Sequence, residues 1–342
     1  MMRVMIVTNS LTGGGAERSM NLVCNELTKR GWAISLVPIN SSPADQVTPI
    51  CEVFPLERPW RGSFVHTIYA MQKFNKIIRL WKPDAIVLNC DLPELFGATQ
   101  IRNHNLVLLE HASNPWASRA SLGKIVRRIL TLRKVNLVAV SSHLTIWPSG
   151  RKPSAVLQNP VTSRAQMKHY ALDPVIKRLV FIGRLSAEKR PDIPLEVCRQ
   201  TGVELVVIGD GLMRAELEKI ALRQSIRVSF RGRIDNPWSE IRPGDLLIVP
   251  SAFEGDGLVV IEGLQQGIPM LLSDTPDFRR FGFPDRNYGK DVGDFTSKLN
   301  TFRDDLPSLL IPHEIANRIL SSRTIEAIGD SWEGFLRQFR LR

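Results

Sequence analysis

Cysteine is scarce in this 342-residue sequence, and no two cysteines are spaced as a CxxC pair. The four that occur, Cys24, Cys51, Cys90 and Cys198, are scattered along the chain. This spacing argues against a zinc site and against a disulfide framework, and it favours a reducing compartment.

Long apolar runs are also missing from the sequence. No stretch approaches the roughly 18–20 apolar residues that are needed to span a bilayer. The amino end, MMRVMIVTNS, has too short an apolar run for a signal peptide, and we predict that it forms a first buried strand. We therefore expect a cytoplasmic protein, either free or peripheral on the inner face of the cell membrane.

Acidic residues are few in the first half of the chain. Residues 1–170 contain 21 Lys and Arg against 9 Asp and Glu, whereas residues 171–342 contain 24 against 25. The two balances are +12 and −1, so the first half carries the whole surplus behind the net charge of +11. Such asymmetry predicts that the first half meets an anionic partner.

The remaining composition is that of an ordinary globular protein, with 43% hydrophobic and 23% charged residues. A chain of this length exceeds what one core usually serves, so we expect two domains. We predict a first domain over residues 1–170 and a second over 171–320, joined in the polar, proline-bearing region 159–174. Residues 321–342 are predicted to form a helix that packs back on the first domain.

Strand-like and helix-like segments alternate along both halves, which favours parallel sheets with helices on both faces. The predicted strands are Arg3–Thr8, Ala33–Pro38, Ala85–Asn89, Leu106–Leu109, Val135–Val140, Arg178–Ile182, Glu204–Ile208, Arg227–Phe230, Asp245–Val249 and Met270–Ser273. The clearest predicted helices cover residues 16–30, 65–81, 118–135, 212–224 and 257–266, with a helical tail from about residue 312. The predicted fold class is α/β, with two doubly wound Rossmann-like domains facing each other across a cleft.

A glycine run, Gly13–Gly15, joins the first strand to the first helix. Glycine lets the backbone approach a ligand closely, although a plain tight turn is the alternative. The run is neither GxGxxG nor a Walker loop, so a nicotinamide or ATP site has little support. Glycine turns also follow strands at Gly209–Gly211 and at Arg231 and Gly232, where they suit a base, a phosphate or simply a tight turn.

Basic residues follow the first strand of the second half. Arg184 and Lys189 come just after Phe181–Gly183, where the ligand cleft is expected. Arginine offers a planar fork and lysine a mobile point charge, a combination suited to a diphosphate. The alternative is a solvated loop.

Two glutamates, Glu254 and Glu262, flank the start of a predicted helix in Pro250–Pro269. We expect the helix to begin near Gly257 and to end at Gly267, because Pro269 cannot continue it. Its free N–H groups suit a phosphate, and carboxylates on either side suit hydroxyl groups. This pattern predicts a sugar-nucleotide site, although glutamates near a helix start are more often solvated.

A single histidine, His111, ends a strand of the first half after Glu110. A lone histidine is more often structural than functional. The carboxyl end of a strand is nevertheless where ligands of such sheets bind, which favours a role in the site.

Together these positions resemble glycosyltransferase family four, the large retaining group with the GT-B fold. The matching motifs are GGAER near the start, GRLxxEK at Gly183–Lys189, GDG at Gly209–Gly211 and EGxGLxxxEGLxxGxP at Glu254–Pro269. The resemblance implies a hexosyltransferase that uses a nucleotide-sugar donor, with UDP the expected nucleotide, needs no metal or other cofactor, and retains the anomeric configuration.

The resemblance also implies roles for individual residues. Arg184 and Lys189 would hold the diphosphate, Glu262 the ribose hydroxyls and Glu254 the hydroxyls of the donor sugar. Amides of Asp256, Gly257, Leu258 and Val259 would lie near the phosphate and sugar, and Gly209, Gly211, Arg231 and Gly232 would belong to the donor site. Gly14, Gly15 and His111 would lie near the reacting centre. The implied catalytic residues are His111, Arg184, Lys189 and Glu254.

This chain departs from the family pattern at three positions. Asp256 stands where the family often has Phe, Gly263 where it often has Ala, and Arg190 where a glycine often follows EK. Asp256 adds a negative charge near the expected sugar, which puts the identity of the donor in doubt.

A basic amphipathic segment, Ser118–Val135, is a candidate for the acceptor side. Its cations, set among apolar residues, are Arg119, Lys124, Arg127, Arg128, Arg133 and Lys134. Such a helix can lie on an anionic bilayer, and the stretch Arg58–Phe64 adds basic and aromatic character. We expect a lipid-linked, lipopolysaccharide or surface-polysaccharide acceptor; an ordinary surface helix is the alternative.

Two other classes of function stay open. One is a GT-B enzyme of another reaction, such as a nucleotide-sugar epimerase or a phosphorylase. The other is a nucleic-acid-binding protein that uses the basic half. Aromatic residues interleaved with the basic ones, and a recognised binding module, are missing for that role, so nucleic acid is not an expected partner.

Overall fold

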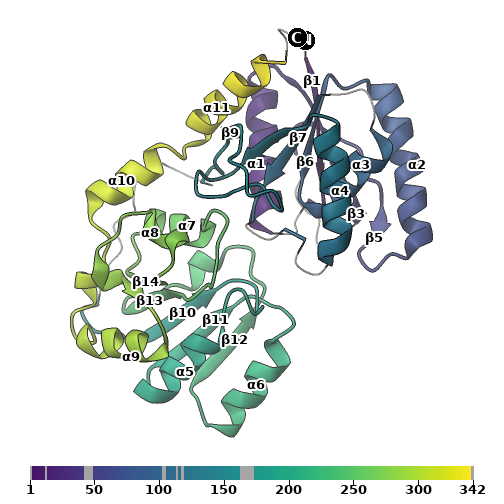
Figure 1. The fold of residues 1–342 in the computed structure, drawn as a ribbon. Coiled ribbons are helices and arrows are strands. Elements are labelled where there is room, and N and C mark those ends of the chain that lie inside the picture. Colours follow the sequence, from purple (N-terminus) through teal and green to yellow (C-terminus); the bar gives the residue numbers. More distant parts are fainter. Residues whose placement is uncertain are drawn as a thin grey trace. The chain divides into compact units, whose positions relative to one another are not determined.

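The computed structural model describes residues 2–11, 14–41, 49–101, 105–112, 115–116, 119–161 and 173–339. The chain divides into two compact units (Figure 1). One unit comprises residues 1–162 with 323–342, and the other comprises residues 163–322. The predicted domain boundary at residue 170 lies outside the described residues, as do residues 340–342.

The first unit contains a parallel sheet with the strand order β4-β2-β1-β6-β7-β8-β9. Its strands are β1 (Arg3–Thr8), β2 (Ala33–Pro38), β4 (Glu52–Val53), β6 (Ala85–Asn89), β7 (Asn105–Glu110), β8 (Asn136–Ala139) and β9 (Ala155–Val156). A separate small ladder pairs β3 (Asn40–Ser41) with β5 (Arg58–Pro59). In the central strand, Ile6 lies opposite Leu36 of β2 and Val87 of β6. The central strands are buried on both faces, which explains their continuous apolar runs.

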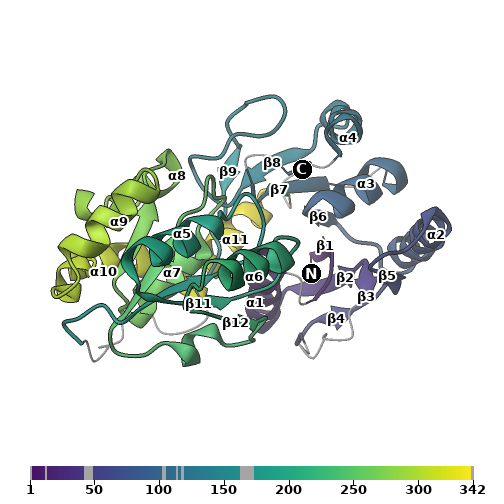
Figure 2. The same cartoon turned by 90° about the horizontal axis from the view of Figure 1, so that it is seen from below.

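Helices cover both faces of this sheet (Figure 2). One face packs on α1 (Gly15–Lys29) and α11 (Ile325–Arg337), and the other packs on α2 (Phe64–Trp81), α3 (Asp91–Gln100) and α4 (Ala120–Leu132). Successive side chains of β1 point alternately to the two faces of the sheet: Val4 and Ile6 belong to the first core, and Met5 and Val7 belong to the second. This alternation follows from the two-residue period of a strand.

The carboxyl-terminal helix α11 packs in the first unit, against α1. Trp332 and Leu336 are buried in the same core as Met20 and Leu27 of α1. At the edge of this contact, Arg30 Nη1 lies 2.6 Å from Asp330 Oδ1, and Trp32 Nε1 donates a 2.6 Å hydrogen bond to Glu333 Oε1. The last helix of the chain therefore completes the core of the first.

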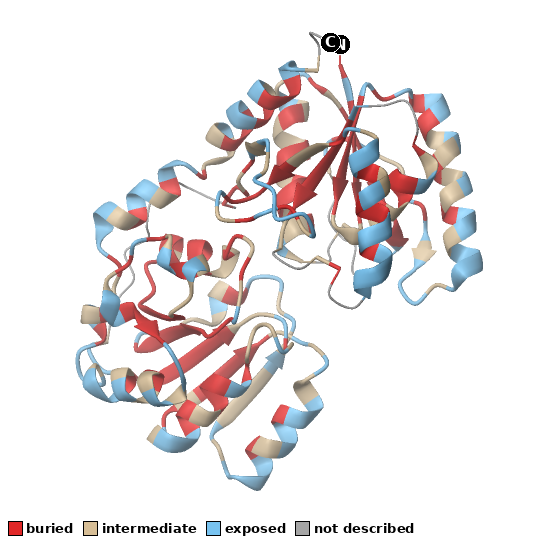
Figure 3. Cartoon of the chain, viewed as in Figure 1, coloured by how far each residue is buried: buried red, intermediate tan, exposed pale blue. Residues whose placement is uncertain are grey.

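The second unit contains a parallel sheet with the order β12-β11-β10-β13-β14-β15. Its strands are β10 (Arg178–Ile182), β11 (Glu204–Ile208), β12 (Val228–Gly232), β13 (Asp245–Val249), β14 (Met270–Ser273) and β15 (Tyr288–Gly289). One face packs on α5 (Asp192–Thr201), α6 (Arg214–Arg223) and α9 (Val292–Thr301). The same unit includes α8 (Pro276–Arg279) and α10 (His313–Ser321), and α10 contacts α7 (Leu258–Gln266). Figure 3 shows the buried residues concentrated in the strands and on the inner sides of the helices.

Helix α7 packs on the opposite face of β13 and β14. A Cβ atom added to Gly263 would lie 2.9 Å from Leu247 Cδ2 and 3.2 Å from Met270 Cε. The Leu247 distance is shorter than real Cβ atoms show and the Met270 distance is a tight one, so the missing side chain lets α7 lie close to the sheet without displacing the ends of these two side chains.

The structure confirms the predicted α/β class, and each predicted strand is present to within two residues. Helix α3 was not predicted, since Pro93 and Gly97 interrupt its pattern. Pro93 is tolerated because it lies in the first turn, and Gly97 packs directly on the Leu88 side chain. None of the helices in the described ranges is both long enough and apolar enough to cross a membrane.

Replacing Trp332 by Ala should destabilise the protein by about 3–5 kcal/mol, because it empties a buried site between α11, α1 and the sheet. Urea denaturation followed by circular dichroism measures the change. The matched control is Trp60→Ala in the same unit, whose side chain is exposed and whose loss should cost less than about 0.5 kcal/mol. Equal effects of the two variants would contradict the packing of α11 in the first unit.

Candidate functional site

The loop after β13 and the start of α7 form the centre of the predicted donor site. Gly257 is the N-terminal cap of α7, with φ 65°, and Gly267 is its C-terminal cap, with φ 69°. Both residues adopt the left-handed conformation that favours glycine, so the predicted limits of this helix are confirmed. The N–H groups of Leu258 and Val259, in the first turn, precede the first helical hydrogen bonds and give this helix end a partial positive charge.

Glu254 is buried and joins two loops of the second unit. Its Oε1 accepts a 2.6 Å hydrogen bond from Lys189 Nζ and a 2.8 Å bond from Ser251 Oγ. The two loops are also joined through the backbone, since Ala252 N donates to Glu188 O at 2.8 Å. The structure therefore brings together two of the predicted catalytic residues, Lys189 and Glu254, as an ion pair beside the start of α7.

Glu262 lies within α7 and is also buried. Its Oε2 accepts a 3.1 Å hydrogen bond from Trp238 Nε1. Trp238 belongs to a short 3₁₀ helix, Pro237–Glu240, that follows β12. Glu262 is thus positioned by a second loop, at the same carboxyl-end side of the sheet as Glu254.

Asp256 is buried and paired with Arg280, a partner that the sequence had not indicated. Arg280 Nη2 donates a 2.7 Å hydrogen bond to Asp256 O and lies 3.4 Å from Asp256 Oδ1. The Arg280 guanidinium also stacks over the Phe281 ring, at 4.3 Å from its centroid. Phe281 and Phe278 lie beside the Gly257 backbone. Arg280 therefore compensates the charge of Asp256, and an Asp–Arg pair stands where related sequences often have an apolar residue.

The glycines of the turn after β11 allow it to contact the loop after β10. A Cβ atom on Gly209 would lie 1.8 Å from Gly183 O, and one on Gly211 would lie 2.4 Å from Leu185 O. Backbone hydrogen bonds connect the same segments, from Gly183 N to Ile208 O and from Leu185 N to Asp210 O, both 3.0 Å. These glycines are required for the close approach of two loops, so a plain tight turn does not account for them.

Arg184 and Arg231 are exposed, and their ion pairs within residues 173–339 are with near neighbours. The Arg184 side chain is 68% exposed and its Nη1 lies 3.8 Å from Glu188 Oε1; Arg231 Nε lies 3.9 Å from Glu240 Oε2. Gly232, next to Arg231, has φ 70°. Arg190 has φ 49°, a left-handed conformation that favours glycine.

The remaining predicted site residues lie in the first unit. Gly14 caps α1 in an extended conformation and Gly15 is its first residue, whereas Gly13 lies outside the described residues. His111 follows β7, and its Nε2 lies 2.5 Å from Asn89 Oδ1 at the end of β6. Asn89 Nδ2 in turn donates to Thr8 Oγ1 at 3.2 Å. His111 is therefore held at the carboxyl ends of β6 and β1, as its place in the sequence predicts.

The prediction that Arg127 faces a membrane or acceptor is wrong. Arg127 is buried: its Nε and Nη2 donate 2.6 Å hydrogen bonds to the two oxygens of Glu94, and its Nη1 lies 2.7 Å from Glu110 Oε2. The reason is its place on α4, where Gly123, Val126, Arg127 and Leu130 form the inner face. That spacing was visible in the sequence and could have identified Arg127 as an interior residue.

The other cations of the basic segment behave differently. Arg119, Lys124, Arg128 and Lys134 are exposed, and Arg133 is half-buried, with its Nη1 donating to Gly97 O and Ile101 O at the end of α3. Ser118 lies outside the described residues, and α4 itself begins at Ala120. The exposed cations stay candidates for contact with an anionic partner.

Asp91, the first residue of α3, lies beside this buried cluster. Burial, together with the nearby charge of Glu94, raises the pKa of Asp91 to about 7. Burial also raises the pKa values of Glu94 and Glu110, against the opposing effect of Arg127. Arg127 thus pairs with two carboxylates, Glu94 and Glu110, at the carboxyl ends of β6 and β7, with Asp91 nearby, and none of the three acids was predicted as a site residue.

Comparisons with known proteins identify sequence relatives of this chain. Residues 163–281 match the protein family described as glycosyl transferases group 1. An uncharacterised glycosyltransferase of Haemophilus influenzae is 23% identical, covering 96% of this chain and 98% of its own length. An N-acetyl-D-galactosaminyltransferase of Campylobacter jejuni, named for a PP-undecaprenol-linked saccharide, is 24% identical over 77% of each chain.

Among solved structures, Anabaena HepE in complex with UDP and glucose is similar in fold. The TM-score is 0.77 at 17% identity, covering 99% of this chain and 100% of HepE. Likeness at this level shows the fold, and the predicted GT-B fold is thereby confirmed.

Replacing Arg280 by Met should cost about 3 kcal/mol, because it removes the guanidinium that pairs with the buried Asp256 carboxylate. The double variant Asp256→Asn/Arg280→Met should recover most of this loss, since the uncompensated charge is then absent. Arg279→Met is the matched control; Arg279 pairs with Asp274 at the surface, and its loss should cost less than about 1 kcal/mol. Thermal unfolding checks all three, and an equally unstable double variant would contradict the pairing.

The raised pKa of Asp91 predicts a pH dependence of stability. In the folded state the Asp91 carboxyl keeps its proton up to about pH 7. In the unfolded state its pKa has the ordinary value of 3.8, so the proton is already lost at lower pH. The contribution of Asp91 to stability is therefore greatest at low pH and falls as the pH rises from about 4 to about 7. Asp91→Asn should reduce the decrease of Tm with rising pH, whereas Asp304→Asn, at an exposed position, should leave that decrease unchanged. Identical pH profiles for wild type and Asp91→Asn would contradict the assignment.

Proposed function

We propose that this glycosyltransferase, which has the GT-B fold and a group 1 family domain in its second unit, transfers a hexose or N-acetylhexosamine from a nucleotide sugar with retention of configuration. The proposed acceptor is a lipid-linked, lipopolysaccharide or surface-polysaccharide precursor at the cytoplasmic face of the cell membrane. The observation that carries the donor half of the proposal is the Lys189–Glu254 ion pair beside the amino end of α7.

The donor would be bound by groups that match its parts. Lys189, Arg184 and the first N–H groups of α7 offer positive charge for a diphosphate. Glu254 and Glu262 offer carboxylate oxygens for hydroxyl groups on either side of it. Arg184 is exposed, so its guanidinium has the freedom to meet a phosphate without breaking a buried contact. HepE, similar in fold, is described as a complex with UDP and glucose, and UDP is the nucleotide that we propose here.

The proposed mechanism follows from where charge develops. As the bond to the sugar breaks, the leaving diphosphate gains negative charge, which Lys189, Arg184 and the end of α7 would stabilise. In this proposal these groups take the role that a metal ion has in other transferases. Double displacement needs a carboxylate nucleophile on the far face of the sugar, whereas in this proposal Glu254, whose Oε1 accepts from Lys189 and Ser251, binds the hydroxyls of the donor sugar. We therefore favour attack by the acceptor hydroxyl on the same face that the diphosphate leaves.

The acceptor half of the proposal rests on charge and on the named relative. Residues 1–170 carry a balance of +12, and α4 exposes cations together with Ile125 and Leu132. The Campylobacter jejuni relative is named for a saccharide on PP-undecaprenol. A polyprenyl diphosphate combines an anion with an apolar tail, and both suit this surface.

Replacing Arg184 by Ala should lower kcat about 10²-fold or more while changing the affinity for the donor much less, because the arginine acts on charge that develops in the transition state. The side chain is exposed, so the Tm should stay unchanged. Lys189→Met should lower kcat similarly and also lower the Tm, since Glu254 loses its partner. Steady-state transfer assays of both variants, with the nucleotide sugar that a thermal-shift screen selects, measure kcat and the affinity for the donor. Thermal unfolding measures the Tm.

Arg223→Ala, at an exposed position of α6, is the control for loss of a positive charge in the same unit. Wild-type rates in both site variants would contradict the donor assignment. Release of free sugar, sugar phosphate or an epimerised nucleotide sugar without dependence on an acceptor would contradict transfer.

A further inference from the structure

The turn before α2 and the first turns of that helix expose a group of large apolar side chains. The exposed fractions are 60% for Trp60, 78% for Phe64, 72% for Val65 and 66% for Tyr69. Single exposed apolar residues are common, but here three aromatic residues and a valine are exposed within ten positions of the sequence. We call these four residues the α2 apolar surface.

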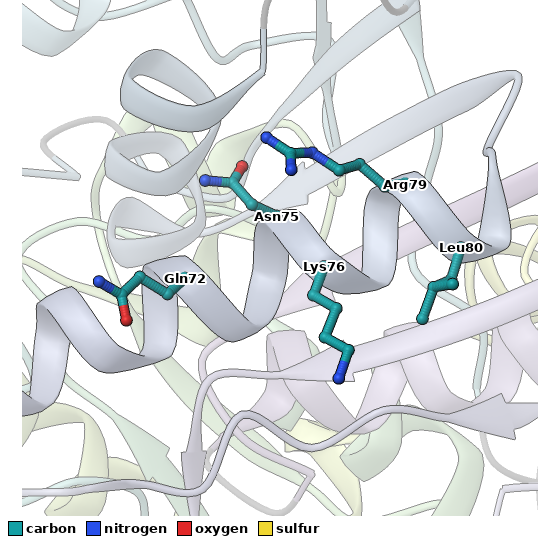
Figure 4. A pocket seen from close by; sticks show the side chains of 5 residues that line it. All are labelled: Gln72, Asn75, Lys76, Arg79 and Leu80. Carbon is teal, nitrogen blue, oxygen red and sulfur yellow. The ribbon is translucent and has the colours of Figure 1, made fainter.

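The remainder of α2 continues this surface with positive charge. At about 100° per residue, Ala70, Phe74, Ile78 and Trp81 point inward and are buried, while Val65, Tyr69, Gln72, Lys76 and Arg79 lie on the opposite side. A surface recess of about 400 Å³ lies along this side and is lined by Gln72, Asn75, Lys76, Arg79 and Leu80 (Figure 4). Apolar and cationic groups therefore follow each other along one outward stripe.

Acidic residues are absent from the helices on this face of the sheet that flank α3. Neither α2 nor α4 contains an Asp or a Glu in its sequence, whereas they carry Lys73, Lys76 and Arg79, and Lys124, Arg127 and Arg128, respectively. Lys73 is paired with Glu57, and Arg127 is buried. The others are exposed, so the charge of this surface is complementary to an anionic partner.

We propose that the α2 apolar surface inserts into the interface of an anionic bilayer, while Lys76 and Arg79 contact lipid phosphates. Aromatic residues prefer the headgroup level of a bilayer, and a helix with one apolar and one cationic portion lies in that plane. This inference rests on the proposed function for its biological purpose, since a lipid-linked acceptor has to be met at a membrane. It assigns insertion to α2 and the turn before it, and it leaves α4 as an electrostatic contact.

A membrane fits this surface better than a nucleic acid does. Stacking on bases would use Trp60, Phe64 and Tyr69, but Val65 and Leu80 have no comparable partner in a polynucleotide. Aliphatic side chains beside cations gain from burial among acyl chains with phosphates above them.

The test is sedimentation with vesicles of phosphatidylcholine alone and with roughly a third phosphatidylglycerol. Wild type should bind the anionic vesicles at least about tenfold more tightly. Trp60→Ser/Phe64→Ser/Tyr69→Ser should lose about tenfold or more of this binding. Leu212→Ser/Leu222→Ser should lose none, although it removes two apolar residues of the second unit that are even more exposed. Lys76→Glu/Arg79→Glu should lose most of the preference for anionic lipid, and Lys219→Glu/Arg223→Glu should keep all of it.

Fluorescence gives an independent readout. Anionic vesicles should shift the tryptophan emission to the blue, and Trp60→Phe should abolish most of that shift. Circular dichroism of each variant shows that it is folded. Wild-type vesicle binding by the triple serine variant would overturn the proposal, as would equal wild-type binding to both kinds of vesicle. Loss of self-association or of nucleic-acid binding by that variant, without loss of vesicle binding, would also overturn it.

The assay contains neither donor nor acceptor, so its outcome is independent of the proposed function. Transfer to a water-soluble acceptor is measured separately with wild type. Vesicle binding without any transfer would support the surface assignment and contradict the proposed function. Transfer without vesicle binding would support the proposed function and contradict the surface assignment.

Discussion

Each unit depends on one constraint: a parallel sheet must be covered by helices on both faces. Because Val4, Ile6, Met5 and Val7 alternate between two cores, β1 has no position left for a polar side chain that does chemistry. The same holds for β10 and β13 in the second unit, whose residues are almost all buried. The groups of the candidate site accordingly lie at the ends of the strands and in the loops and helices that follow them.

The geometry of the donor site depends on contacts between these segments. Gly209 and Gly211 let the turn after β11 touch the loop after β10, and that loop carries Lys189 to Glu254 in the loop after β13. Neither charged residue is positioned by its own strand alone. Substitutions of the glycines would therefore disturb the ion pair from a distance, although they remove no charge from the site.

The sequence predicted those features that depend on local pattern. Apolar runs identified the strands, and Gly257 and Gly267 identified both ends of α7, because a left-handed cap is a property of single residues. The sequence did not predict Asp256–Arg280 or Arg127 with Glu94 and Glu110, since these partners are 24, 33 and 17 residues apart and meet only after the chain has folded. Arg127 was misplaced because charge was counted along the segment, although its spacing from Val126 and Leu130 put it on the inner face.

Burial of acidic residues also affects where the positive charge of the first half is exposed. Glu17, Glu94 and Glu110 are buried, and Asp91 is partly so, which withdraws them from the surface, whereas most of the cations of α2 and α4 are exposed. Buried acids contribute little to the surface, so the outer sides of α2 and α4 are predominantly positive. Glu94 and Glu110 lie with Asp91 at the carboxyl ends of β6 and β7, whereas most of the cations of α2 and α4 lie on the outer sides of these helices. An anionic partner is therefore attracted to the outer sides of these helices, and net charge alone cannot distinguish them from the strand ends, where Glu94 and Glu110 are paired with Arg127.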